Sequence, residues 1–401
     1  MRTRLFDPSA NPRFDDLPWH IDLAGWEHPR LVEVPVGLHR HVVRFVEYSG
    51  QLYVLKELPQ RLAEREFRLL RTMNDRGLPV VAAVALVDQR GGPEAVLITR
   101  FLNYALPYRH LFSERDGDDV SDVLVESLAI LVARLHSAGF LWGDCSLSNA
   151  MFRRDGRHLS AFALDTETGE LHDRLSAGQR RFDIEMAVVN VAGGLCDLAG
   201  AGGLPDGVDP FDVAEKLADT YEMVWSELHG ESTYDLKDPA ALERRLERVH
   251  ELGFDVREAV ITEAADMNSR TFKPAAIVDG HYLRELYRLT GIMAREHQAR
   301  RLLEHIGIFR NDLESKLERT VTLEDAGHLW LTDSFDPVMS AVPSDVAGQL
   351  ERPQLFLEVL DHHQTRDWGT RTRGDLVEAA CSYAAGVLKS RAREGSLPLI
   401  D

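Results

Sequence analysis

The stretch from Leu135 to Asn149 constrains this chain most. Its sequence is LHSAGFLWGDCSLSN. An apolar helix end is followed by a glycine turn, a short apolar strand and a polar loop. The loop carries Asp144 and, five residues later, Asn149. An acid and an amide close together after a strand can form a polar site. Asp144 and Asn149 are therefore the first candidates for functional residues.

Ahead of this loop, the sequence predicts a sheet with one helix. The predicted strands, all β-branched or alternating runs, are 31–36, 42–48, 52–58, 80–87 and 95–101. Residues 60–74 carry apolar side chains at helical spacing. A helix at about 119–138 leads into the loop. The loop is followed by short strands at 150–153 and 159–164 and by a buried helix at 183–192.

Lys56 lies in one of the predicted strands, within the run YVLKEL. A lysine in a strand that faces a core needs a partner. Glu66 follows ten residues later, and the apolar residues three and four positions beyond it place it on the inward face of the helix. A Lys56–Glu66 ion pair would direct the ammonium group toward phosphate. Glu64 is the competing partner, and a surface lysine near a solvated helix face is the simpler alternative.

Three further residues stand where a phosphate-transfer site would use them. Asp165 ends a predicted strand sixteen residues after Asn149, where a carboxylate could chelate the Mg²⁺ that bridges nucleotide phosphates. Gly37 lies nineteen residues before Lys56, where a phosphate-covering loop would begin, although that loop has one glycine rather than three. Asp183 opens the buried helix and corresponds to a kinase position that braces the backbone of the catalytic loop; a cap of the helix is the alternative.

The order and spacing of these residues resemble the protein-kinase-like superfamily over about residues 31–200. The chain is most similar to its atypical bacterial branch, which includes lipopolysaccharide-core (Kdo/heptose) kinases and aminoglycoside phosphotransferases. Those families also place a glycine before the loop aspartate, as in Trp142-Gly143-Asp144. Residues after about 210 resemble an uncharacterised bacterial family of unknown function that follows such a domain.

The resemblance implies an α+β chain with a two-lobed protein-kinase-like fold followed by a mainly α-helical domain. The run GAGGLPDGVDP at 200–210 is the clearest linker in the sequence. The expected parts are an N-terminal arm at 1–30, a kinase-like N-lobe at 31–103, a truncated C-lobe at 104–203 and a helical C-terminal domain at 211–401.

The resemblance also implies a site that uses ATP with Mg²⁺ and transfers a phosphoryl group to a hydroxyl-bearing acceptor. Asp144 would act as the base toward that hydroxyl, and Glu66 would hold Lys56 against the nucleotide. The implied residues are Asp144, Lys56 and Glu66 for catalysis, Gly37, Lys56, Asn149 and Asp165 for the nucleotide, and Asn149 and Asp165 for the metal.

Several positions depart from conventional protein kinases. Asp-Phe-Gly is replaced by Asp165-Thr166-Glu167, no Ala-Pro-Glu segment follows, and Ser146 stands where protein kinases carry a lysine. These departures favour a small-molecule, glycan or other atypical acceptor. They also leave open a nucleotide-binding pseudokinase that acts as a regulatory or scaffold protein through its C-terminal domain. Glu167 could add a metal-site carboxylate or have a structural role.

Charge and composition exclude some classes of protein. A formal net charge of −19 disfavours binding to nucleic acid or to anionic membranes. No apolar run approaches the roughly 18 residues of a membrane span. The three cysteines, Cys145, Cys196 and Cys381, are scattered, so a disulfide framework is not expected. Cys145 is expected to be a buried, inert thiol, and the protein is expected to be cytoplasmic.

The C-terminal half is predicted to be mainly helical and could bind a protein partner. The predicted helices are 211–228, 239–252, 281–306, 354–363 and 375–391, with strands at 256–262 and 328–331. The loop 363–373 is the best candidate for a recognition element. A nucleic-acid-binding function is the least favoured hypothesis, because acidic residues alternate with the basic ones and indicate a salt-bridged helix face. These basic residues are Arg295, Arg300, Arg301 and Arg310.

Overall fold

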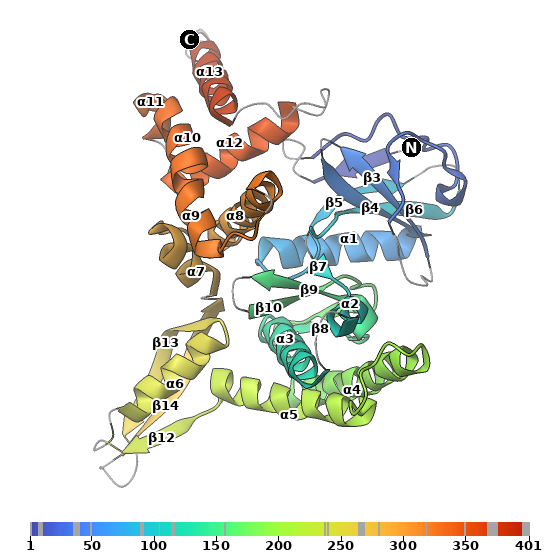
Figure 1. Cartoon of the computed structure of the whole chain (residues 1–401), viewed down its shortest axis with the longest axis vertical. Helices are drawn as coiled ribbons and strands as arrows, with labels where there is room; N and C mark the ends of the chain where they lie inside the picture. The colour runs from blue at the N-terminus through green and yellow to red at the C-terminus, as the bar shows by residue number, and fades with distance from the viewer. Residues whose placement is uncertain are drawn as a thin grey trace, which may run out of the picture. The chain divides into compact units, whose positions relative to one another are not determined.

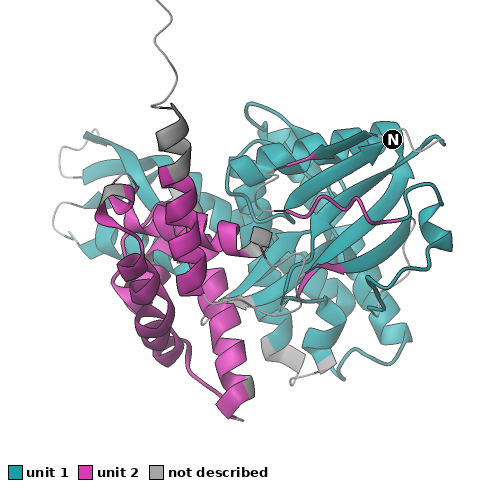
Figure 2. Ribbon diagram, turned by 90° about the horizontal axis from the view of Figure 1, so that it is seen from above, with its two compact units in different colours: residues 1–4, 18–46, 52–278 teal, residues 5–17, 47–51, 279–401 magenta. Residues whose placement is uncertain are grey.

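The computed structural model describes residues 2–6, 11–34, 41–48, 50–88, 92–103, 105–113, 117–155, 158–235, 238, 240–263, 269–279, 281–317, 319–348, 350–366 and 376–394. Gly37 and residues 367–373 of the predicted recognition loop lie outside these ranges. The chain forms two compact units (Figure 2). The first comprises residues 1–4, 18–46 and 52–278, and the second comprises residues 5–17, 47–51 and 279–401.

A six-stranded sheet contains a strand at each of the five places predicted from the sequence and one more strand at residues 2–5 (Figure 1). Its strands are β1 (Arg2–Leu5), β2 (Leu31–Val32), β3 (Val42–Tyr48), β4 (Gln51–Pro59), β5 (Ala83–Asp88) and β6 (Glu94–Arg100). Their order in the sheet is β1-β5-β6-β4-β3-β2. Strand β4 therefore lies inside the sheet, where it pairs with β6 in antiparallel register and places Lys56 opposite Leu97.

Helix α1 (Gln60–Asp75) follows β4 directly. Its buried side chains recur every three to four residues, as the sequence predicts for an amphipathic helix. They are Ala63, Glu66, Phe67, Leu70 and Met73. Glu66 is thus a carboxylate on the buried face of α1, and such a group is costly to bury without a partner.

Described residues near the N-terminus, 2–4 and 18–30, belong to the first unit. Strand β1 joins the sheet beside β5, and Arg2 and Arg4 both donate to the buried carboxylate of Asp88, at 2.7 and 2.8 Å. Trp19 and Trp26 pack edge to face, and both rings are buried.

The next part of the first unit holds the loop with Asp144 between helices. Its elements are β7 (Ala105–Leu106), α2 (Tyr108–Ser113), α3 (Gly117–Ser137), β8 (Phe140–Leu141), the 3₁₀ turn η2 (Leu147–Asn149), β9 (Ala150–Asp155), β10 (His158–Ala163), β11 (Glu170–Leu171) and α4 (Ala177–Gly200). Strands β9 and β10 form an antiparallel hairpin, and β8 pairs with β11. These two small sheets fix both ends of the loop.

The first compact unit continues past the predicted linker to residue 278. Helix α5 (Pro210–His229) packs on α3 and α4. It is followed by β12 (Ser232–Asp235), α6 (Ala240–Glu251), β13 (Phe254–Glu263) and β14 (Ser269–Asp279), with the sheet order β12-β14-β13. The predicted strand at 256–262 is confirmed by β13. The domain bounds drawn from the sequence stay a prediction.

The second unit is helical in its C-terminal part. Its helices are α7 (His281–Thr290), α8 (Glu296–Leu317), α9 (Leu323–Trp330), the π-helical turn η3 (Leu331–Phe335), α10 (Asp336–Ala341), α11 (Ser344–Ala347), α12 (Arg352–Arg366) and α13 (Leu376–Glu394). The predicted strand at 328–331 is wrong, because Trp330 packs as a helical residue against Phe335 and Phe356. The predicted helix at 281–306 is interrupted at Gly291, whose φ of +68° ends α7.

Basic residues of this unit form ion pairs, although two of their acidic partners come from other segments rather than from the alternating acids of the sequence. Arg295 pairs with Glu351 at 3.1 Å. Arg301 pairs with Asp361, which lies on α12. No helix in the described part of the chain is long and apolar enough to cross a membrane.

Gly139 fixes the turn that leads from α3 into the loop. Its φ is +82°, and an added Cβ would lie 2.1 Å from the carbonyl oxygen of His172. The carbonyl oxygen of Gly139 accepts a hydrogen bond from the amide of His172 at 2.8 Å. The turn therefore requires glycine for its conformation and for the close approach of a second strand.

We expect Gly139→Ala to destabilise the protein more than Gly77→Ala. Gly77 also has a positive φ, +72°, but nothing lies within 4 Å of the position that a Cβ would take there. Gly77→Ala should cost about 1–2 kcal/mol from backbone strain alone, and Gly139→Ala should add the clash with His172. Denaturant unfolding of both variants measures the difference, and equal losses would contradict the role assigned to Gly139.

Candidate active site

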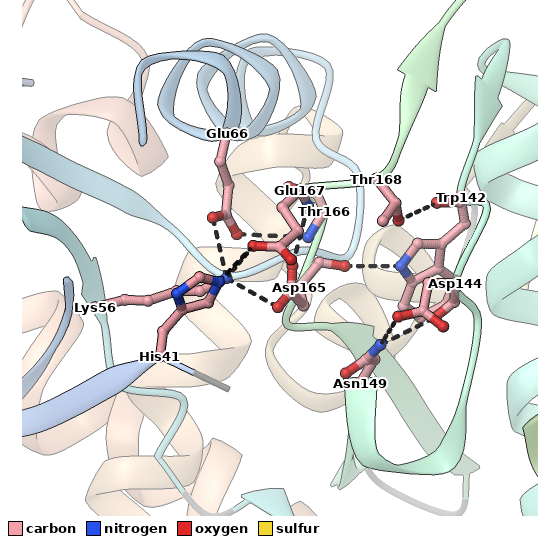
Figure 3. A network of polar contacts seen from close by, with 10 residues as sticks. All are labelled: His41, Lys56, Glu66, Trp142, Asp144, Asn149, Asp165, Thr166, Glu167 and Thr168. Atoms are coloured by element: carbon pink, nitrogen blue, oxygen red, sulfur yellow. Dashed lines mark hydrogen bonds and ion pairs between the residues drawn. The ribbon is translucent and has the colours of Figure 1, made fainter. Parts of the chain in front are cut away.

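Lys56 is the centre of a polar network that joins three segments of the first unit (Figure 3). Strand β4 alternates, with Tyr53 and Leu55 buried on one face and Lys56 on the other. The Nζ atom of Lys56 lies 3.2 Å from Glu66 Oε2 and 2.8 Å from Asp165 Oδ2. It also lies 3.3 Å from Glu167 Oε2. The predicted Lys56–Glu66 pair is thus present.

The competing partner, Glu64, is engaged elsewhere. Its carboxylate accepts hydrogen bonds from Arg4 at 2.9 Å and from Gln60 at 3.2 Å. Helical geometry explains the difference, because residues two positions apart on a helix point to different faces. Glu66 faces inward and is 1% exposed, whereas Glu64 reaches the sheet edge where β1 lies.

In both Glu66 and Lys56, burial and the charge of the other residue shift the pKa in opposite directions. Burial raises the pKa of Glu66 to about 7, with a further upward contribution from the charge of Asp165, while Lys56 opposes the shift. Burial alone would lower the pKa of Lys56, but the charges of Glu66, Asp165 and Glu167 raise it above its usual value. Lys56 therefore stays charged, whereas Glu66 holds its proton to a higher pH than a free carboxyl group does.

Asp165 and Glu167 come from the loop that follows β10. Trp142 holds this loop by donating from its ring nitrogen to the carbonyl oxygen of Asp165 at 2.7 Å. The amide of Glu167 donates to Asp165 Oδ1 at 3.0 Å. Both carboxylates reach Lys56 Nζ, so the two side chains point toward the same site. One carboxylate oxygen from each of Glu66, Asp165 and Glu167 lies within 4.8 Å of the others.

Asp144 and Asn149 lie together at the other end of the network (Figure 3). The side-chain nitrogen of Asn149 donates to the carbonyl oxygen of Asp144 at 2.9 Å and to its Oδ2 at 3.1 Å. The amide nitrogen is therefore occupied, and Oδ1 is the atom of Asn149 that could bind a cation. Partial burial raises the pKa of Asp144, and the charges of Asp165 and Glu167 raise it further. A raised pKa makes this carboxylate a better proton acceptor.

Asn190 is a site residue that the sequence analysis missed. Its side-chain nitrogen donates to Asp144 Oδ1 at 3.1 Å and to the carbonyl oxygen of Cys145 at 3.2 Å. Asn190 therefore holds the oxygen of Asp144 that Asn149 does not. The signal was available in the sequence, since Asn190 lies two helical turns after Asp183 and so on the same face of the helix.

Asp183 braces the loop from within α4. Its two oxygens accept the backbone amides of Trp142 and Gly143, each at 2.7 Å. His136 Nε2 contacts the same carboxylate at 3.0 Å. The alternative of a helix cap is wrong, because α4 begins several residues earlier at a capping box made by Ser176 and Gln179.

Ser146 and Cys145, which the sequence analysis discussed, and His41, which it did not, also lie near the site. The Ser146 hydroxyl caps η2 by accepting the amide of Asn149 at 3.3 Å, so it has a local structural contact. Cys145 is buried, as expected, and burial raises the pKa of its thiol well above the usual value. His41, which the sequence analysis did not select, lies 3.3 Å from Glu167 Oε2.

The donor set fits Mg²⁺ and a nucleotide phosphate. Three carboxylates surround the single ammonium group of Lys56 within the described residues, so negative charge exceeds positive charge there. Carboxylate and amide oxygens are the ligands that Mg²⁺ takes in proteins. Asp165 and Asn149 would hold the metal, with Glu167 close by, and Lys56 would meet the phosphates.

We expect Glu66 to make stability fall as the pH rises. Its pKa is about 7 in the folded protein against 4.5 as a free group, so between these values the folded protein holds a proton that the unfolded chain has lost. The stabilising contribution is complete below pH 4.5 and is lost by about pH 7. Relative to Glu66→Gln, the wild type should lose roughly 3 kcal/mol over that interval. Denaturant unfolding across this range tests it, and parallel profiles for the two proteins would contradict it.

Two family models match parts of this chain. Residues 44–185 match the lipopolysaccharide kinase (Kdo/WaaP) family. Residues 223–388 match a domain of unknown function (DUF4032). Both matches confirm the resemblances drawn from the sequence. No curated protein sequence matches the chain.

Two solved structures are similar to parts of this chain. A structure of WaaP in complex with acyl carrier protein is 18% identical, with 63% of this chain and 99% of that chain covered and a TM-score of 0.39. An aminoglycoside-3'-phosphotransferase of type VIII is 13% identical, with 50% of this chain and 88% of that chain covered and a TM-score of 0.35. The chain is of the α+β class predicted from its sequence, and its C-terminal part is mainly helical.

Proposed function

We propose that this protein is a Mg·ATP-dependent phosphotransferase that acts on a hydroxyl group. The observation that carries the proposal is the position of Lys56, which is held by Glu66 and lies 2.8 Å from the carboxylate of Asp165. A partly buried lysine directed at a carboxylate that could bind a metal is the arrangement that positions nucleotide phosphates for transfer. The match of residues 44–185 to a kinase family supports the same function.

Each site residue has a role in this proposal. Lys56 binds phosphate oxygens and Glu66 keeps it extended. When bound at Asp165 and Asn149, Mg²⁺ supplies charge neutralisation at those oxygens. Asp144 orients the acceptor hydroxyl and accepts its proton, while Asn149 and Asn190 hold its carboxylate in place. The contribution of the protein is mostly positioning and electrostatic stabilisation.

The acceptor is proposed to be a small molecule or a glycan. The sequence lacks the Ala-Pro-Glu segment that supports peptide substrates in protein kinases. Ser146 caps η2 and is too short to steady the γ-phosphate as a lysine would. The name of the matched family points to sugar hydroxyls as the acceptor class. ATP is most abundant in the cytoplasm, and the described cysteines are free, so we place the activity there.

Calorimetric titration of Mg·ATP tests the nucleotide site first. Wild-type protein should bind Mg·ATP, and Asp165→Ala should lose the dependence of binding on Mg²⁺ because the metal loses a charged ligand. Asp206→Asn removes an exposed acidic charge and serves as the control, with unchanged binding expected. Absence of binding to the wild type would contradict the proposal.

Phosphate transfer tests the role of Asp144. In a screen of sugar and small-molecule acceptors with labelled ATP, Asp144→Asn should retain nucleotide binding and lose transfer by at least about 100-fold, the usual contribution of a general base. Equal transfer by wild type and Asp144→Asn would contradict the assigned role. Nucleotide binding without transfer to any acceptor would instead support a nucleotide-responsive binding protein.

A further inference from the structure

One oxygen atom of the site lies between two nitrogen atoms from different segments of the chain. Glu167 Oε2 is 3.3 Å from Lys56 Nζ and 3.3 Å from His41 Nε2. The side chains of His41 and Glu167 are 16% and 15% exposed, so the contact is largely shielded from water. Figure 3 shows the imidazole of His41 and the ammonium group of Lys56 converging on this position.

The contact between His41 and Glu167 is not a formed hydrogen bond. The Nε2 atom of His41 is fully buried and makes no hydrogen bond to any of the described residues. Burying a ring nitrogen without a hydrogen-bond partner is costly. A better-placed acceptor at the position of Glu167 Oε2 would therefore be bound favourably by both nitrogen atoms.

An oxygen of a phosphate group has the required chemistry. It carries negative charge and can accept from an ammonium and an imidazole at once, and such charge-assisted hydrogen bonds are short and strong. His41 directly precedes β3, and β3 is the neighbour of β4 in the sheet. The imidazole and Lys56 thus reach the same point from adjacent strands.

The local sequence gives a reason for a second donor. Phosphate-covering loops rich in glycine bind phosphates through backbone amides. Between Val36 and His41 the sequence contains one glycine, Gly37, where such loops carry three. A side-chain donor at the end of this segment would replace part of that contribution.

Resting on the proposed function, we propose that His41 and Lys56 form a two-donor subsite for a nucleotide phosphate oxygen. Glu167 fills this subsite with its own carboxylate oxygen until nucleotide displaces it. Lys56 keeps its pairs with Glu66 and Asp165 when Glu167 leaves, so the network remains in place. Displacement moves one carboxylate and leaves the backbone contacts of the loop unchanged.

The first test compares His41→Gln with His20→Gln, a matched change at an exposed position of the same unit. Displacement of a fluorescent nucleotide by ATP and by adenosine gives the affinities. His41→Gln should weaken ATP binding by about tenfold or more and leave adenosine binding unchanged, because adenosine has no phosphate. A loss equal to that of His20→Gln, or an equal loss for adenosine, would overturn the proposal.

The second test removes the competing carboxylate. In the presence of a metal chelator, Glu167→Gln should bind ATP about tenfold more tightly than wild type, since a charged competitor is lost. Glu170→Gln removes the same charge three residues away, from a residue that contacts Arg65 and His172 instead, and controls for the general loss of negative charge. If both variants gain equally, or neither gains, Glu167 does not occupy the subsite.

A double variant links the two observations. If Glu167 competes for the position beside His41, the gain from Glu167→Gln should shrink in the His41→Gln background. An unchanged gain would overturn the assignment of His41. Failure of the proposed function is a separate result, because wild-type protein would then not bind Mg·ATP at all.

Discussion

The convergence of three carboxylates on one lysine is the constraint on which the rest of the site depends. Lys56, Glu66 and the Asp165–Glu167 segment come from β4, α1 and the loop after β10. Their contact therefore fixes how the six-stranded sheet meets the hairpin of β9 and β10. Removing one partner from such a group leaves buried charge without compensation, which is strongly destabilising. The same excess of negative charge creates the demand for a cation that the proposed function requires.

A second set of contacts holds the loop with Asp144 in place. Asp183 accepts two consecutive backbone amides, and Asn190 restrains Asp144 by donating to its carboxylate. Both residues lie on α4, so one helix determines the backbone path and the side-chain orientation together. The ring of Trp142 then ties this loop to the carbonyl oxygen of Asp165. Asp144 and Lys56 are thus parts of one continuous network rather than separate clusters.

The sequence predicts those parts of the structure that depend on local patterns. Helical spacing identifies the inward face of α1 and hence the Lys56–Glu66 pair, and strand alternation places Lys56 itself. The contributions of His41 and β1 depend on contacts between distant residues, which a single sequence does not display. The predicted strand at 328–331 failed because a short apolar run has no period that separates a strand from a buried helical turn.

A crystal structure with Mg²⁺ and a non-hydrolysable ATP analogue tests the central claim most directly. The account predicts that Lys56 contacts the phosphates while it remains paired with Glu66, and that the metal lies on Asp165 and Asn149. A nucleotide bound away from Lys56, or a metal held without Asp165, would contradict it.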